Sequence, residues 1–90
     1  MSGSILIVDA LATNRILMKV RLGNGFYSVA QAASGAAALQ EVRREAPDLI
    51  LVSLPLPDMD LETLQRELAR IAPARTPAII ALLAPECDAR

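Results

Sequence analysis

The chain has 90 residues, nine basic and ten acidic, so its formal net charge is -1. This length allows one small domain, and a nearly neutral chain has no electrostatic footprint for nucleic acid or an anionic membrane. Hydrophobic residues make up 53% of the chain and aromatic residues only 2%, so we expect an aliphatic core. The apolar runs are far shorter than the roughly 20 residues that cross a membrane.

Cysteine and histidine usage narrows the classes of protein further. One cysteine and no histidine exclude an internal disulfide and the usual zinc ligand sets within one chain. The N-terminal segment MSGSILIVDA has no basic stretch of the kind that opens a secretory signal peptide, and it reaches an acid at Asp9. We therefore expect a cytoplasmic protein whose residues 1–90 form one domain.

Four aliphatic segments are typical of strands. The strongest is DLILVS at 48–53, whose continuous apolar run predicts burial on both faces, as in the centre of a parallel sheet. A fourth buried strand is expected near the end of the chain. The expected strands are 5–8, 26–32, 48–53 and 78–83.

Amphipathic segments separate these strands. Thr13 and Asn14 are candidate N-cap residues for a first helix, which Gly23 and Gly25 should end. Ser34 is expected to cap an alanine-rich second helix, and leucines at three- and four-residue steps predict a third over 61–71. Strand and helix thus alternate, which predicts an α/β fold: an open parallel sheet with helices on both faces.

Candidate site residues follow from this fold, because open parallel sheets bind ligands beyond the carboxyl ends of their strands. The residues at those ends, and in the loop after the third strand, are Asp9, Ala10, Ser53, Asp58, Leu82 and Leu83.

Three separated segments, ILIVDALATNR, SGAAALQEVRREAPDLILVSLPLPDMD and TPAIIALL, resemble the receiver domain of two-component response regulators. The resemblance covers nearly the whole chain. Among receivers, the chain is most similar to those of diguanylate cyclase response regulators, although this finer match is weak. It implies a flavodoxin-like arrangement of βα repeats. Because a complete receiver has five strand–helix units, it also implies that 1–90 lacks the C-terminal part and is truncated after the fourth strand.

The resemblance also assigns roles to positions of this chain. Asp9 matches the first of two acids that help a receiver hold a divalent cation, and Ala10 replaces the second. Ser53 stands at the position of the phosphoryl-accepting aspartate. The switch position, a Thr or Ser in the family, falls on Leu82 or Leu83. Asp9, Ala10 and Asp58 would then line a degenerate acidic pocket.

Each of these residues has a second interpretation. Asp9 is either a remaining metal ligand or a strand cap bonded to the next turn. Asp58 and Asp60 fit turn and N-cap roles as well as ligand roles. Ser53 is either a phosphorylated serine or a small residue that fills a disused pocket. Since Mg²⁺ favours carboxylate oxygens, we expect no cofactor, with Mg²⁺ binding lost or weak.

These losses predict a non-catalytic pseudo-receiver, a regulatory or interaction module of a response regulator that is not phosphorylated by the aspartate mechanism. The alternative is a functional phosphoacceptor with an altered site, N-terminal to an output domain such as a diguanylate cyclase. The expected partners are proteins: a histidine kinase, a fused output domain, or a second copy that covers apolar surface on the fourth strand. Neither nucleic acid nor membrane is expected to bind, and the module is not expected to be an enzyme.

Overall fold

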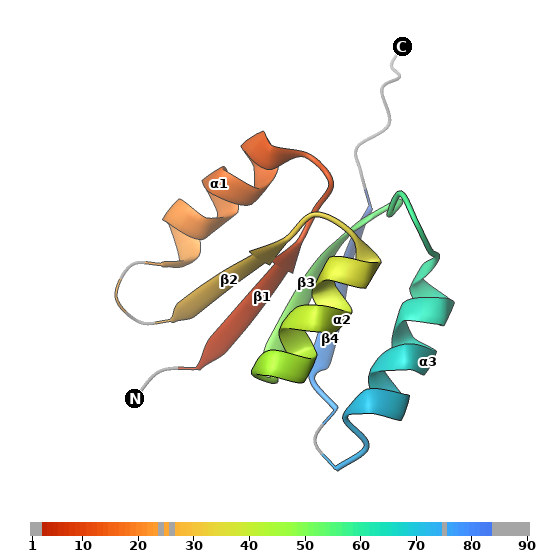
Figure 1. The fold of residues 1–90 in the computed structure, drawn as a ribbon. Helices are drawn as coiled ribbons and strands as arrows, with labels where there is room; N and C mark the ends of the chain where they lie inside the picture. The colour runs from red at the N-terminus through yellow and green to blue at the C-terminus, as the bar shows by residue number, and fades with distance from the viewer. Residues whose placement is uncertain (1–2, 24, 26, 75, 84–90) are drawn as a thin grey trace.

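The structure is a computed structural model that describes residues 3–23, 25, 27–74 and 76–83. In this part of the chain, strands and helices alternate, and all strand pairs are parallel. The strands lie side by side in the order β2-β1-β3-β4 (Figure 1). This confirms the predicted α/β fold. The elements are β1 (Ser4–Val8), α1 (Ala12–Leu22), β2 (Ser28–Ala32), α2 (Gly35–Arg44), β3 (Leu49–Leu54), α3 (Leu61–Ile71) and β4 (Ala78–Leu83).

The aliphatic core lies between the sheet and the two helices α2 and α3. Alternate side chains of β1 and β3 point to this face, since successive residues of a strand face opposite sides of a sheet. The leucines of α3 that recur at helical spacing complete the core, and Leu64 and Leu68 are fully buried. Each buried aliphatic side chain stabilises the fold by about 1.5–3 kcal/mol. The strand residues of this core are Leu6, Val8, Ala32, Ile50 and Val52.

The opposite face of the sheet is only partly covered. Helix α1 contacts β1 and β2, and Figure 1 shows it on the side away from α2 and α3. On this face, Ile80 of β4 is 48% exposed and Leu82 is 38% exposed. Their neighbour in β3, Leu51, is half-buried. The prediction that β3 is buried on both faces is therefore wrong, because within the described residues no helix covers that half of the sheet. The fourth strand is not fully buried either, and it exposes the apolar surface that the sequence led us to expect there.

The first helix begins earlier than the sequence predicted. Helix α1 starts at Ala12, its N-cap is Leu11, and no side chain caps it. Thr13 and Asn14 lie inside the helix, so their predicted N-cap role is wrong. The physical reason is Asp9, whose side chain accepts the Leu11 N–H and turns the chain directly after β1.

Other predicted ends agree closely with the structure. The Gly23 N–H donates to the Lys19 carbonyl at 2.7 Å and ends α1. The Ser34 side chain accepts the Ala37 N–H and caps α2, as predicted. The predicted second strand starts too early, since β2 begins at Ser28, and Phe26 lies outside the described residues.

Within the described part of the chain, no helix is both long and apolar enough to span a membrane.

Candidate functional site

The carboxyl ends of β1, β3 and β4 bring three predicted site residues side by side. Val8 of β1 pairs with Val52 of β3, so the next residues, Asp9 and Ser53, are neighbours across the same two strands. On its other side, Ser53 pairs with Leu82 of β4. The parallel register thus sets Asp9, Ser53 and Leu82 in a row at one edge of the sheet.

Asp9 is buried, with 5% of its surface exposed, and its carboxylate forms a hydrogen bond within the adjacent turn. Its Oδ1 accepts the Leu11 N–H at 2.9 Å, and its backbone N–H donates to the Ala32 carbonyl at 3.0 Å. The Arg15 guanidinium donates to the Asp9 carbonyl at 2.7 Å. Of the two interpretations of Asp9, this geometry is that of the strand cap bonded to the next turn.

The Asp58 carboxylate serves the start of α2. Its Oδ1 accepts the Gly35 N–H and its Oδ2 accepts the Ala36 N–H, both at 2.9 Å. These two backbone hydrogen bonds, from Ala36 first and then Gly35, lower the pKa of Asp58 below its ordinary value. The positive end of the α2 dipole also favours an anion here. The structure thus uses both oxygens of Asp58 as a helix cap; the sequence indicated a cap but not which helix it serves.

The same loop ends on a second cap. Asp60 is the N-cap of α3, and its Oδ1 accepts the Thr63 N–H at 2.8 Å. Hydrogen bonding to Thr63 lowers the pKa of Asp60. The sequence-based interpretation of Asp60 as an N-cap is confirmed.

The row of residues at the carboxyl ends of the strands contains few polar groups. Ser53 contributes a half-buried hydroxyl, Leu82 a hydrocarbon side chain, and Ala10 is an exposed methyl after Asp9. The register also separates the two candidates for the switch position: Leu82 pairs with Ser53, whereas Leu83 pairs with Leu54. Among the described residues, no three His, Cys, Asp or Glu side chains gather where they could hold a metal ion.

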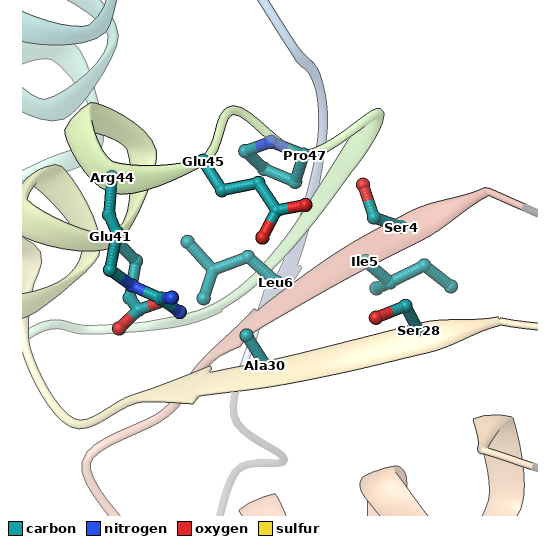
Figure 2. Close-up of a pocket in the computed structure, with 9 residues that line it drawn as sticks. All are labelled: Ser4, Ile5, Leu6, Ser28, Ala30, Glu41, Arg44, Glu45 and Pro47. Atoms are coloured by element: carbon teal, nitrogen blue, oxygen red, sulfur yellow. The ribbon is translucent and has the colours of Figure 1, made fainter.

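A small pocket of about 40 Å³ lies at the other end of the strands (Figure 2). It sits between the first residues of β1 and β2 and the end of α2, where Arg44 and Glu41 form an ion pair at 2.8 Å. This volume holds roughly one or two water molecules. The pocket is remote from Ser53, and the sequence analysis did not predict it. Its lining residues are Ser4, Ile5, Leu6, Ser28, Ala30, Glu41, Arg44, Glu45 and Pro47.

The family model of the response regulator receiver domain matches residues 5–86. The chain belongs to this family. It is 38% identical over 72 residues to the chemotaxis protein CheY of Bacillus subtilis, a match that covers 79% of this chain and 60% of that protein. It is 42% identical over 67 residues to the sporulation initiation phosphotransferase F of the same species, covering 73% of this chain and 54% of the relative. The receiver thus spans little more than half the length of these relatives.

Two further similarities bear on the fine resemblance and the fold. The receiver is 38% identical over 68 residues to the response regulator PleD of Caulobacter vibrioides, which is 76% of this chain and 15% of PleD. A crystal structure of a sensor protein from Polaromonas sp. JS666 superimposes with a TM-score of 0.80 at 32% identity, covering 91% of this chain and 66% of that one. These matches confirm a two-component receiver of flavodoxin-like fold, as the sequence predicted.

Proposed function

We propose that this receiver is a pseudo-receiver: a non-catalytic regulatory or interaction module of two-component signalling that does not accept a phosphoryl group on an aspartate. The observation that carries the proposal is the row at the carboxyl edge, in which Ser53 lies between Asp9 and Leu82. In the family, the acceptor carboxylate occupies the position of Ser53.

Each residue of the row weakens phosphoryl transfer for a physical reason. Nucleophilic attack by the Ser53 hydroxyl needs a base, whereas a carboxylate is already anionic. Asp9 is the acid beside Ser53, and its Oδ1 already accepts the Leu11 N–H. Because Ala10 follows Asp9, the site has too few carboxylate oxygens to favour Mg²⁺. Without the metal ion, the negative charge of a transferring phosphoryl group is poorly stabilised. We therefore propose that Mg²⁺ binding is lost or weak.

The test is incubation of the protein with Mg²⁺ and a small phosphodonor such as acetyl phosphate, followed by intact mass measurement. We expect no added phosphoryl group. A matched Ala10→Asp/Ser53→Asp variant restores both carboxylates and is expected to gain an acid-labile adduct under the same conditions. An acid-labile adduct on any aspartate of the unmodified chain would overturn the proposal.

The alternative is a functional phosphoacceptor with an altered site, N-terminal to an output domain such as a diguanylate cyclase. The match to the response regulator PleD, which covers 15% of that protein, supports a receiver that forms part of a longer response regulator. Sequencing the gene downstream of the codon for Arg90 would identify any output domain. An acid-stable phosphoryl group on Ser53 would favour this alternative.

We also propose a cytoplasmic location and protein partners, namely a histidine kinase or a fused output domain, rather than nucleic acid or membrane. The nearly neutral charge supports this choice, since nucleic-acid and anionic-membrane surfaces attract basic proteins. Self-association is part of the proposal, because the exposed side chains of Ile80 and Leu82 form apolar surface on β4. Size-exclusion chromatography with light scattering tests it; a monomer at all concentrations would contradict it.

A further inference from the structure

The Met59 thioether packs against the first residue of α2. Met59 lies half-buried in the loop after β3, whereas Gly35 is buried. A Cβ at Gly35 would lie 2.6 Å from both Cγ and Sδ of Met59, and 2.8 Å from Cε. The Met59 side chain, sulfur included, therefore occupies the space that a larger residue in place of Gly35 would need. This contact holds an oxidisable sulfur against the start of a helix.

Hydrogen bonds join the same loop and helix beside this contact. Asp58 precedes Met59, and its two carboxylate oxygens accept the N–H groups of Gly35 and Ala36, each at 2.9 Å. Asp60 follows Met59 and is the N-cap of α3. Met59 thus lies between the residues that cap two helices, and a shift of the backbone at Met59 would disturb both caps.

Thioethers undergo a reversible oxidation under mild conditions. A sulfur lone pair attacks hydrogen peroxide, so that an S–O bond forms and the O–O bond breaks. The proton of the transferred hydroxyl passes to the departing hydroxide, which leaves as water; sulfur is oxidised and the peroxide is reduced. The product is methionine sulfoxide, a polar side chain that sulfoxide reductases return to methionine. This change disrupts packing where the thioether lies in a core or a contact.

We propose that Met59 is a site of reversible oxidation, and that its sulfoxide releases the loop after β3 from α2. Sδ lies so close to Gly35 that no oxygen atom fits between them. The sulfoxide oxygen also needs a hydrogen-bond donor, and the Gly35 N–H already donates to Asp58. The oxidised side chain therefore turns toward solvent, which it reaches because Met59 is only half-buried. Asp58 moves with it, and its two hydrogen bonds to α2 are lost.

This inference goes beyond the proposed function, because oxidation of Met59 requires no phosphoryl group. The loop begins after Leu54, the last residue of β3, and Ser53 precedes Leu54 at the carboxyl edge. Release of the loop therefore changes the surface beside the position at which the family accepts a phosphoryl group. A pseudo-receiver and an altered phosphoacceptor have the same Met59 contact, so the failure of either interpretation of Ser53 leaves this inference standing.

Peroxide treatment followed by tryptic mapping tests the site. The chain has three methionines, and cleavage after Lys and Arg places Met59 on peptide 45–66, apart from the other two. We would work in a Met18→Leu/Cys87→Ser background, which removes the other internal methionine and the thiol. The matched control adds Met59→Leu, since exchange of Met for Leu conserves volume and is tolerated well in cores. Both proteins keep Met1, so the peroxide meets the same N-terminal sulfur in each.

We expect peptide 45–66 to gain one oxygen atom and the melting temperature of the background protein to fall by about 4–8 °C, as loss of capping contacts does in a domain of this size. The control should keep its melting temperature, and sulfoxide reductases should restore that of the oxidised protein. Adding Asp58→Ala should reduce the shift, because the hydrogen bonds that oxidation breaks are then already absent. Met59→Gln, a polar unbranched side chain introduced without peroxide, should also melt at the lower temperature.

The outcomes separate oxidation of Met59 from release of the loop. Peptide 45–66 that stays unmodified while the peptide carrying Met1 is oxidised overturns the proposal, as does an oxidised protein that melts like the control. An equal shift in the Asp58→Ala variant, or a Met59→Gln protein as stable as the background, shows that the loop is not released and overturns it too. A reversible shift that requires both Met59 and Asp58 supports the proposal.

Discussion

The Asp58 carboxylate accepts the backbone N–H of Gly35 at 2.9 Å, which ties the loop after β3 to the start of α2 across 23 residues of sequence. The Ala36 N–H binds the other oxygen at the same distance. Helix N-termini leave backbone N–H groups without an intrahelical partner, and Asp58 supplies acceptors for two of them. One side chain thus links a helix to a loop that lies far from it in the sequence.

Removal of this link should destabilise the domain. We expect Asp58→Ala to lower the free energy of unfolding by about 1 kcal/mol, as loss of a capping side chain does elsewhere. Urea denaturation at neutral pH measures the change. Asp58→Asn keeps one acceptor oxygen and should lose less. Equal stability of Asp58→Ala and the unmodified chain would show that the two hydrogen bonds contribute nothing net.

Acid should weaken the same contacts. The pKa values of Asp58 and Asp60 are both lowered in the folded chain from an ordinary value of 3.8. A carboxyl with a depressed folded pKa contributes stability above its unfolded pKa and loses it as pH falls through the folded pKa. We therefore expect unfolding free energy to fall from about pH 4 downward, and to fall less steeply in an Asp58→Ala/Asp60→Ala variant. Identical slopes in the two proteins below pH 4 would contradict this assignment.

A side chain at Gly35 should force the Met59 side chain to move. A Cβ at Gly35 would lie 2.6 Å from both Cγ and Sδ of Met59, closer than atoms can pack. We expect Gly35→Ala to cost about 1–3 kcal/mol of unfolding free energy, as overpacking does. Combining it with Met59→Ala should recover part of that loss. A double-mutant cycle measures the coupling, and purely additive changes would rule out the clash as the cause.

Core and surface positions should respond very differently to the same kind of truncation. Leu68 is fully buried between α3 and the sheet, so Leu68→Ala is expected to cost about 2–5 kcal/mol and to leave a domain this small close to unfolding. Val20 of α1 is 68% exposed, so Val20→Ala should change stability by less than about 0.5 kcal/mol. Thermal melts compare them; similar losses at both sites would contradict the described packing.

Local sequence signals predicted the parts of the fold that local contacts decide. The bounds of α3 agree with the prediction because its leucines recur at helical spacing and Asp60 caps it three residues before Thr63. The N-cap Ser34 was predicted for the same reason. The prediction for Thr13 and Asn14 failed because Asp9 had already turned the chain at Leu11.

Features that join distant segments were beyond such signals. Nothing near Asp58 in the sequence identifies α2 as the helix it caps. The apolar run of β4 predicts a strand but not which face is covered, since coverage depends on where helices dock; Ile80 is the example. Asp9, Ser53 and Leu82 were each predicted as site residues from the sequence. Only the register of β3 and β4 shows that Leu82, and not Leu83, lies beside Ser53.

The strand order β2-β1-β3-β4 has a consequence for how the chain is made. Synthesis runs from the N-terminus, so β1 is made first. β2 and then β3 follow it in the chain and pair with its two sides. β4 then adds to the free edge of β3. Each strand after β1 therefore pairs with a strand that precedes it in the chain, and none has to be inserted between two earlier strands.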